Sequence, residues 1–302
     1  MADISIEIAG MRLENPFIFA SGIFGKEYSE LYDLSDWGAI TTKSLTYHPR
    51  DGNPAPRIAE TPCGLLNSIG LANPGVMRFV EEELPFLDTL STRKIVSIAG
   101  ETEDEFAKIM DALSPYEGSF DAYELNVSCP NVSRGGMAFG TSAELTHSLV
   151  ARVRLCTDKP LIVKLTPNVT DIVGVAQAAC DAGADAISLI NTIVGMVIDI
   201  EHRKPLLGDR FGGLSGPAVK PVAVACVFKV ASAISVPIIG GGGISSWRDG
   251  VEFLMAGADA ISVGSAVFAN PTIINELTDK LSSFIDRGEF TSVRDIVGVA
   301  RG

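Results

Sequence analysis

Short apolar runs alternate with longer amphipathic stretches along most of the chain. The apolar runs predict eight strands, at 16–22, 39–44, 94–100, 122–128, 160–167, 186–192, 237–243 and 260–266. The stretches between them predict helices at 73–87, 102–113, 142–157, 171–182, 216–234, 246–256 and 271–287. Runs that are apolar throughout are typical of parallel strands covered by helices. Eight such units favour a closed barrel over an open doubly wound sheet, so we predict an α/β fold, a (β/α)8 TIM barrel that spans residues 1–302 as a single domain.

A short internal repeat supports this architecture. The segment AGADAIS occurs at 182–188 and again at 256–262, 74 residues later. Each copy spans the end of a predicted helix, a glycine-containing turn and the start of a strand. The spacing fits two strand–helix units of ordinary length.

Three long connections interrupt the alternation, at 45–72, 129–141 and 193–215. Each follows a predicted strand, so all three belong to the C-terminal face of the barrel, where barrel enzymes build their active sites. Long connections in a compact fold are often functional. We therefore expect the site at this face.

Composition limits the classes of ligand that the chain can bind and the cellular locations that it can have. The net charge of −13 disfavours binding to an extended nucleic acid, although a few lysines at a pocket mouth can still attract a small anion. No run approaches the roughly 20 apolar residues that span a bilayer. The chain starts with MADISIEIAGMRLENP, which lacks the basic and apolar regions of a signal peptide. We predict a soluble cytoplasmic protein with no membrane partner.

The cysteines and histidines suggest no metal site. The five cysteines are scattered, and no two of them form a CxxC motif, so we expect neither disulfides nor an iron–sulfur cluster in this chain. His48, His147 and His202 show no metal-ligand spacing. We interpret the cysteines outside the 129–141 connection as packing residues; they are Cys63, Cys156, Cys180 and Cys226.

Polar residues at the strand ends are the candidates for chemistry. They are Lys43, Asn126, Lys164, Asn191 and Thr192. A lysine inside the run VKL is costly to bury without an anion nearby. Lys164 therefore predicts either a salt bridge to a carboxylate on a neighbouring strand or a ligand that becomes negative, such as a reduced flavin.

Glycines end the last two predicted strands. Gly240–Gly243 end strand seven, and Gly264 with Ser265 ends strand eight. Backbone N–H groups can approach an anion closely at such glycines, and these two connections form the usual phosphate site of barrels. The pattern predicts phosphate binding, but it leaves open whether the phosphate belongs to FMN or to a phosphorylated substrate.

Cys129 follows strand four, in the segment NVSCPN, with Gly135 and Gly136 shortly after it. A thiol has an ordinary pKa near 8.5, so a small downward shift makes it a base near neutral pH. The two glycines would allow the connection to close over a site.

As a set, these segments resemble class 1 dihydroorotate dehydrogenases. They cover nearly the whole chain, in order: KSLT at 43–46, NSIGLANPG at 67–75, NVSCPN at 126–131, KLTPNVTDI at 164–172, INT at 190–192, GGGGI at 240–244 and VGSA at 263–266. The segments after SCPN and around TPNVTDI are more similar to the NAD-linked type 1B than to the fumarate-linked type 1A. Class 2 enzymes use a serine as base, which Cys129 argues against.

The resemblance implies the oxidation of dihydroorotate to orotate in de novo UMP biosynthesis, with FMN as cofactor and Cys129 as the base for the C5 proton while C6 passes hydride to flavin N5. Lys43 would act beside Cys129 and contact both flavin and substrate. The implied substrate residues are Lys43, Asn67, Ser68, Ile69, Gly70, Leu71, Asn126, Asn191 and Thr192. The implied FMN residues are Ser21, Lys43, Ser44, Ser97, Asn126, Lys164, Ile190, Gly216, Gly242, Gly243, Gly264 and Ser265.

One residue departs from the family pattern. Many relatives carry Asn where this chain has Ser97, and the shorter side chain puts its contact with flavin in question. The resemblance also implies partners: a homodimer of this chain joined by a subunit with FAD and a [2Fe–2S] cluster, in a heterotetramer that delivers electrons to NAD.

Other interpretations stay open at this stage. A type 1A enzyme would also lack a cluster and would use fumarate. A tRNA-dihydrouridine synthase is disfavoured by the negative charge, whereas dihydropyrimidine dehydrogenase has a closer barrel but a substrate without a carboxylate. A barrel that binds a phosphorylated ligand without redox chemistry, as a scaffold or sensor, would not bind flavin.

Overall fold

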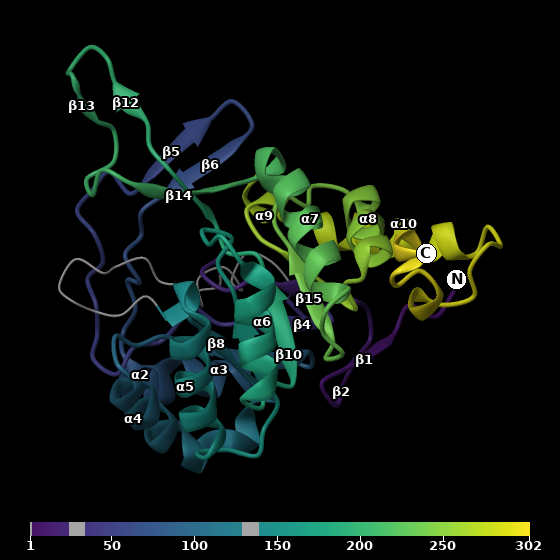
Figure 1. Ribbon diagram of the computed structural model, residues 1–302, viewed down its shortest axis with the longest axis horizontal. Helices are drawn as coiled ribbons and strands as arrows, with labels where there is room; N and C mark the ends of the chain where they lie inside the picture. The colour runs from purple at the N-terminus through teal and green to yellow at the C-terminus, as the bar shows by residue number, and fades with distance from the viewer. Residues whose placement is uncertain (1, 24–33, 129–138) are drawn as a thin grey trace.

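Eight parallel strands close into a barrel in the computed structural model, which describes residues 2–23, 34–128 and 139–302 (Figure 1). Each strand pairs with the next one in the barrel, and the last pairs with the first. The strands are β3 (Phe17–Phe19), β4 (Ala39–Thr41), β7 (Arg93–Ile98), β8 (Ala122–Asn126), β9 (Leu161–Lys164), β10 (Ala186–Leu189), β15 (Ile238–Gly241) and β16 (Ala260–Val263). Seven lie inside the predicted ranges and β7 begins one residue before its range, so the predicted barrel is confirmed. That the whole chain is one domain stays a prediction.

Helices cover the outside of the barrel. They are α2 (Val76–Arg78), α3 (Leu84–Leu87), α4 (Glu103–Leu113), α5 (Ala143–Arg154), α6 (Ile172–Asp181), α7 (Lys220–Ala231), α8 (Trp247–Ala256), α9 (Ala266–Ala269) and α10 (Ile273–Ile285). Two predicted helices are less regular than expected. The 73–87 stretch contains a π-helical turn at Phe79–Glu83 between α2 and α3, and the 216–234 stretch begins with a 3-10 turn at Pro217–Val219.

Side chains at the helix starts explain where several helices begin. Thr102, Ser142 and Asp171 accept hydrogen bonds from backbone N–H groups in the first turns of α4, α5 and α6. Ser246 and Asp249 form a reciprocal capping box at the start of α8. Each of these contacts satisfies a backbone donor that the helix itself leaves unpaired.

Both copies of the AGADAIS repeat form the same structure, a glycine turn after a helix followed by an aspartate that bonds to the neighbouring strand. Gly183 and Gly257 adopt positive φ angles of 101° and 114° where α6 and α8 end. Asp185 then accepts a 2.8 Å hydrogen bond from the N–H of Leu161, and Asp259 accepts one of 2.8 Å from Ile238. In both copies the aspartate therefore fastens the start of the neighbouring barrel strand, as the spacing of two strand–helix units suggests.

The lower part of the barrel interior is apolar. One buried residue from each barrel strand belongs to this lower layer, which consists of Ile18, Ala39, Ile95, Ala122, Ile162, Ala186, Ile239 and Ala260. A hairpin of β1 (Ile6–Ile8) and β2 (Met11–Leu13), which the sequence pattern did not predict, packs Ile8, Met11 and Leu13 against the layer. The N-terminal end of the barrel is thereby filled with hydrocarbon.

Two of the long connections form sheets at the opposite end. β5 (Ile58–Thr61), β6 (Gly64–Asn67), β14 (Gly212–Ser215) and β11 (Ile193–Gly195) make a four-stranded antiparallel sheet, the insert sheet, in the order β11-β14-β6-β5. A further hairpin of β12 (Ile198–Asp199) and β13 (Lys204–Pro205) projects beyond it (Figure 1). The predicted position of the inserts is confirmed, whereas their strands were missed.

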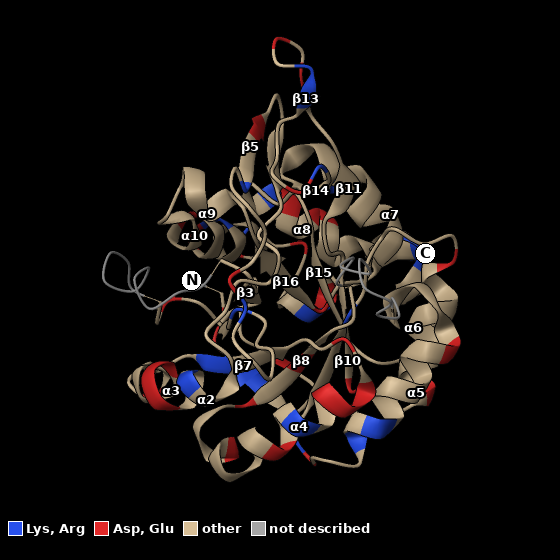
Figure 2. Cartoon of the chain, turned by 90° about the vertical axis from the view of Figure 1, so that its left-hand side faces the viewer, with Lys and Arg blue, Asp and Glu red and all other residues tan. Residues whose placement is uncertain are grey.

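Charged residues of both signs lie on the outer helices α4 and α5 (Figure 2). No helix among the described residues is long and apolar enough to cross a bilayer. Cys180 and Cys226 are half-buried in α6 and α7, and Cys156 is half-buried two residues after α5 rather than inside it. Cys63 is exposed, so its interpretation as a packing residue is wrong.

Candidate active site

A polar layer lies directly above the lower layer in the barrel interior. Side chains that point inward recur every two residues along a strand. Two positions after each residue of the lower layer, the strands and their ends carry Ala20, Thr41, Ser97, Glu124, Lys164, Ser188, Gly241 and Ser262. The barrel interior therefore changes from hydrocarbon to polar groups within two residues.

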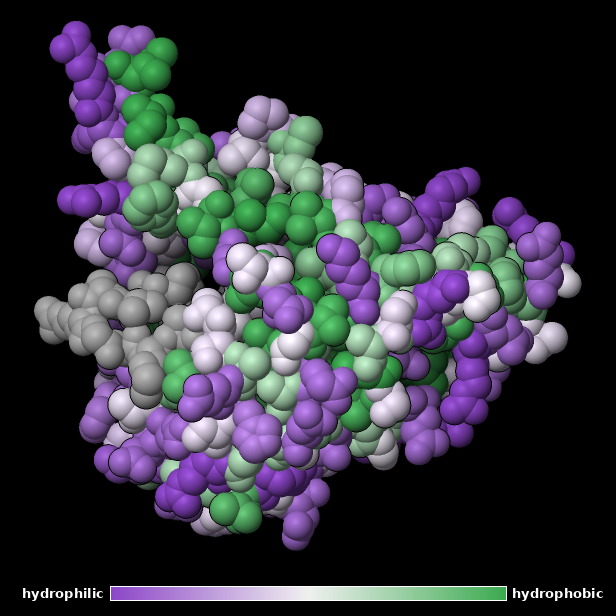
Figure 3. Space-filling view, viewed as in Figure 1, coloured by the Kyte–Doolittle hydropathy of each residue, from purple (hydrophilic) through white to green (hydrophobic). Residues whose placement is uncertain are grey.

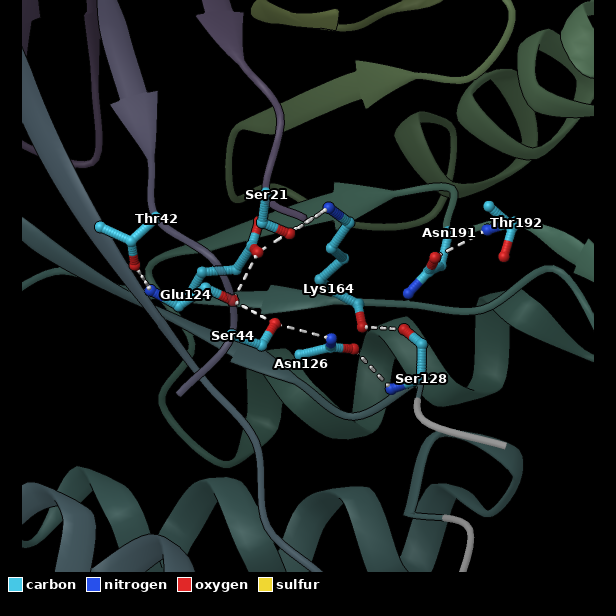
Figure 4. Close-up of polar contacts among 10 residues, drawn as sticks. Ser21, Thr42, Ser44, Glu124, Asn126, Ser128, Lys164, Asn191 and Thr192 are labelled. Carbon is cyan, nitrogen blue, oxygen red and sulfur yellow. Dashed lines mark hydrogen bonds and ion pairs between the residues drawn. The ribbon is translucent and has the colours of Figure 1, made fainter. Parts of the chain in front are cut away.

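Hydrogen bonds join the polar layer to the strand ends above it (Figure 4). The Nδ2 of Asn126 donates to Ser44 Oγ at 2.9 Å, Ser44 Oγ lies 2.9 Å from Ser97 Oγ, and Ser97 donates to Glu124 Oε1 at 3.0 Å. Because an amide NH₂ only donates and a carboxylate only accepts, both hydroxyl groups must point toward Glu124. The Oδ1 of Asn126 accepts from the N–H of Ser128 at 3.2 Å, which fixes the orientation of its amide.

Lys164 is buried in the polar layer, with 8% of its surface exposed. Its Nζ donates to Ser21 Oγ at 3.0 Å and lies 3.8 Å from Glu124 Oε1 on the neighbouring strand β8. The salt bridge that the sequence left open as one explanation of this lysine is therefore present. Sequence reasoning missed Glu124 as its partner.

The rim above the polar layer carries the remaining predicted strand-end residues. Lys43 is half-buried, and it forms no hydrogen bond or ion pair with any residue that the structure describes. Asn191 accepts a 2.8 Å bond from the N–H of Thr192 through its Oδ1, and the N–H of Ile190 donates to the carbonyl of Gly241 at 2.9 Å. Figure 4 shows Asn191 and Thr192 beyond the end of β10, on the Lys164 side of the network.

The predicted substrate segment at 67–71 is held by the insert sheet. Asn67 donates to the carbonyl of Gly213 at 3.2 Å, and Ser68 accepts from Asn53 at 2.8 Å. Gly70 and Leu71 both have positive φ angles, of 72° and 56°. The segment therefore has a specific shape that depends on both inserts.

Two asparagines that sequence reasoning missed support this arrangement. Asn73 donates to Thr46 Oγ1 at 2.8 Å and to the carbonyl of Leu71 at 2.7 Å, while its Oδ1 accepts from the N–H groups of Thr46 and Gly75. Asn168 donates to the carbonyl of Thr192 at 2.9 Å and accepts from Val194. The segments ANPG and TPN contained the signal, because an asparagine beside a proline often forms side-chain turns.

The glycine turns after β15 and β16 present free amides. The N–H groups of Gly242, Gly243, Gly264 and Ser265 donate to no described residue. A Cβ on Gly243 would lie 2.7 Å from the carbonyl oxygen of Gly216, so that this turn accepts no side chain. Unpaired backbone donors gathered at glycines suit a phosphate.

An ion cluster lies next to the same turn, since a Cβ on Gly243 would lie 2.8 Å from the backbone nitrogen of Lys220. Lys220 donates to Asp249 and Glu252, both at 2.7 Å, and these bonds raise the pKa of Lys220. Burial alone would raise the pKa of Asp249, but the bonds from Lys220 and from Ser245 and Ser246 outweigh it and lower that pKa. The cluster thus joins the start of α7 to α8, and Asp249 also accepts a hydrogen bond from the backbone N–H of Ser245, two residues after Gly243.

The donor set fits FMN. The barrel end combines free amides for a phosphate, a buried cation for the flavin edge that becomes negative, and asparagine amides for a heterocycle. Ser97 has no exposed surface and lies below the rim. Cys129, Gly135 and Gly136 lie outside the described residues. Among the described residues, no group of three or more His, Cys, Asp or Glu side chains could hold a metal ion.

The fold and this site define a class: a (β/α)8 barrel with a polar, cationic binding site at the C-terminal ends of its strands, where barrel enzymes carry out their chemistry. The profile of the dihydroorotate dehydrogenase family matches residues 3–285, and the chain belongs to this family.

Similar proteins match nearly the full length of the chain. The catalytic subunit of dihydroorotate dehydrogenase B (NAD(+)) from Geotalea uraniireducens is 47% identical, over 98% of this chain and 97% of that protein. The subunit of the same name from Thermoanaerobacter pseudethanolicus is 48% identical, over 98% of both chains, and the one from Bacteroides thetaiotaomicron is 45% identical, over 99% of both. The resemblance to the NAD-linked type 1B is thereby confirmed.

Proposed function

We propose that this chain oxidises dihydroorotate to orotate, in de novo pyrimidine biosynthesis, with FMN bound across the open end of the barrel. The observation that carries this proposal is the buried Lys164, held between Ser21 and Glu124 beside the free amides of the last two strand ends. A cation in that position stabilises negative charge that develops on a flavin. The family and the names of the relatives support the same reaction.

The proposed cofactor residues divide by the part of FMN that they meet. Gly216, Gly242, Gly243, Gly264 and Ser265 would hold the phosphate through backbone N–H groups. Ser21, Lys43, Ser44, Asn126, Lys164 and Ile190 would line the ring. Ser97 would act through Ser44 rather than by direct contact, because its hydroxyl is buried between Ser44 and Glu124.

The proposed substrate residues face the other side of that ring. Lys43, half-buried and without an ionic partner among the described residues, would meet the carboxylate of dihydroorotate. Amide groups can both donate to and accept from the pyrimidine ring, and they are supplied by Asn67, Asn126 and Asn191, with Thr192 beside them. Ser68, Ile69, Gly70 and Leu71 would complete the pocket wall through their shaped backbone. Polar groups placed in this way reject ligands that leave them unpaired.

Cys129 would be the base. In the reaction the C5–H bond breaks and its proton passes to the sulfur of Cys129, while the C5–C6 double bond forms. FMN, when bound, accepts the hydride that leaves C6. The assignment comes from the NVSCPN motif, in which Cys129 follows β8 by three residues.

Flavin reduction tests the proposal directly. Purified protein should be yellow, and its flavin absorbance should bleach when dihydroorotate is added without oxygen. Cys129→Ala should retain FMN but lose most of this reduction, whereas Cys129→Ser should keep slight activity that rises with pH. Protein that cannot be loaded with FMN would contradict the whole proposal, and flavin reduction by dihydrouracil rather than dihydroorotate would move the chain to a dihydropyrimidine dehydrogenase.

We further propose NAD as the final acceptor, reached through a partner subunit with FAD and a [2Fe–2S] cluster. The relatives are named catalytic subunits of an NAD(+) enzyme, which supports a partner. The isolated chain should therefore reduce NAD only after that subunit is added. Turnover with fumarate alone would indicate type 1A. The cytoplasmic location stays a prediction.

Exposed apolar residues support an assembly with other chains. Val194, Met196, Ile198 and Ile200 have 47%, 40%, 51% and 79% of their surface exposed, along β11 and the projecting hairpin (Figure 3). Such a surface is typical of a protein interface. We propose a homodimer with two partner subunits, to be tested by light scattering of the chain alone and of the complex. A monomer that forms no complex would contradict this assembly.

A further inference from the structure

Glu124 is a buried carboxylate that the proposed reaction does not use. It lies on β8 within the barrel, with 4% of its surface exposed, one layer above Ala122 and one layer below Asn126. Burying a carboxylate is costly unless it is paired and hydrogen-bonded. Glu124 meets both conditions through Lys164 and Ser97, so its charge is built into the floor of the site.

The pair consists of the two ionisable residues of the polar layer. Lys164 Nζ lies 3.8 Å from Glu124 Oε1, and the side chains are 10% and 5% exposed. Every fully buried side-chain nitrogen and oxygen in the described part of the chain has at least one hydrogen-bond partner, and Lys164 contacts both Ser21 and Glu124. Lys164 therefore reaches a ligand above it as half of an ion pair and not as an isolated cation.

We propose that Glu124 is a positioning residue that sets, through Lys164, the reduction potential of FMN bound above the pair. This inference rests on the proposed function, because it requires a flavin beside Lys164. A nearby negative charge offsets part of the field of the lysine. The two-electron reduced cofactor carries more negative charge than the oxidised one, so Glu124 lowers the potential below the value that Lys164 alone would give.

The main test is Glu124→Gln. Glutamine keeps the size of the side chain and an oxygen that can accept from Ser97, but it removes the charge. The midpoint potential of bound FMN should rise, by an amount that changes the ratio of reduced to oxidised flavin about tenfold, or ~30 mV for a two-electron couple. A dye-coupled redox titration measures this shift, and sulfite, whose flavin adduct is also anionic, should bind about tenfold more tightly.

Glu117→Gln is the matched control. Glu117 accepts hydrogen bonds from Tyr123, at 3.0 Å, and from Thr157, at 2.6 Å, so the same chemical change disturbs a bonded carboxylate. Tyr123 belongs to the apolar core outside the barrel, next to Glu124 in sequence but on the opposite face of β8. This variant should leave the potential and the sulfite affinity unchanged.

Ser97→Ala gives a result of opposite sign and decides the question if Glu124→Gln does not fold. Ser97→Ala removes the hydrogen bond that Ser97 donates to Glu124 but leaves the negative charge of Glu124 in place, so the midpoint potential of bound FMN should fall. An unchanged potential in Glu124→Gln, in protein whose flavin dihydroorotate still reduces, would overturn this inference and leave the proposed function intact. A wild-type chain that takes up no FMN would overturn both.

Discussion

The lower layer and the polar layer of the barrel interior come from the same eight strands, two residues apart, but they have opposite character. The lower layer contains only alanine and isoleucine and is sealed by the β1–β2 hairpin. The polar layer holds serines, a threonine and the Lys164–Glu124 pair, with an open rim above it. Stability and binding are thus separated along the barrel axis, and substitutions in the two layers should have different consequences.

The largest effect should come from placing a charge in the lower layer. Ile162→Lys puts an ammonium group two residues below Lys164, among apolar side chains that offer it no partner. We expect it to cost about 5 kcal/mol of unfolding free energy, a large part of what a typical domain has. Ile162→Met, which conserves volume, should cost about 1 kcal/mol. Urea denaturation compares the two, and equal midpoints would contradict the description of this layer.

Replacing the charged Lys164 of the polar layer with an apolar residue should cost less unfolding free energy, and a second substitution should restore most of it. Lys164→Met leaves Glu124 buried without its cation, at a cost of about 3 kcal/mol. Adding Glu124→Gln removes the orphaned charge and should restore most of that loss. Urea denaturation of the apoprotein measures both steps, and FMN fluorescence should show weakened binding in each variant. A double variant no more stable than Lys164→Met would mean that the pair is not the source of the cost.

These layers also show how much of the fold the sequence could predict. Each barrel strand is buried on both faces, so its apolar run stands out between turn residues, and all eight were found. The insert strands were missed because segments such as Gly212–Ser215 are rich in glycine and half-buried, without apolar alternation. Their pairing is also non-local, and no short window of sequence contains both partners.

The candidate site was predictable in its residue types more than in its connections. Lys164, Asn126 and Ser44 were named from motifs, and the structure joins them through Ser97 and Glu124. Glu124 could have been found by counting in steps of two, since it lies two residues after Ala122 on β8 as Lys164 lies two residues after Ile162 on β9. A sequence motif identifies the residues that would contact a ligand. The residues that hold them in place, such as Glu124, can be found only from the register of neighbouring strands.

Alanine substitutions at two glycines of the rim should distinguish the effect of backbone strain on stability from the effect of ligand contact on FMN binding. Gly243→Ala introduces a side chain at φ +81°, against the carbonyl of Gly216, and should cost about 2 kcal/mol. A Cβ on Gly264 would meet Ile23 only at 3.8 Å, so Gly264→Ala should leave stability within about 0.5 kcal/mol of wild type. Under the proposed function it should still weaken FMN binding about tenfold, as the methyl group faces the phosphate. Thermal unfolding and FMN titration distinguish the two.

The smallest effect should come from the ion cluster of α7 and α8, and it should depend on pH. The pKa of Asp249 is lowered in the folded chain, so its charge stabilises the fold above its ordinary value of 3.8, and that contribution is lost as the pH falls further. Asp249→Asn should cost about 1 kcal/mol at pH 7. The gap between wild type and variant should narrow below pH 3.8, and urea midpoints measured from pH 7 to pH 3 would show a constant gap if the ion pairs contributed nothing.

The insert sheet has a consequence for synthesis on the ribosome. β6 pairs with β14, and Asn67 bonds to Gly213, 146 residues further along the chain. At about 5–20 residues per second, the older strand waits roughly 7–30 s for its neighbour to be translated. During that interval the hairpin of β5 and β6 has an uncovered edge, which is where nascent chains aggregate or attract chaperones. The wall that holds residues 67–71 is thus completed late, after translation has passed the sixth strand of the barrel.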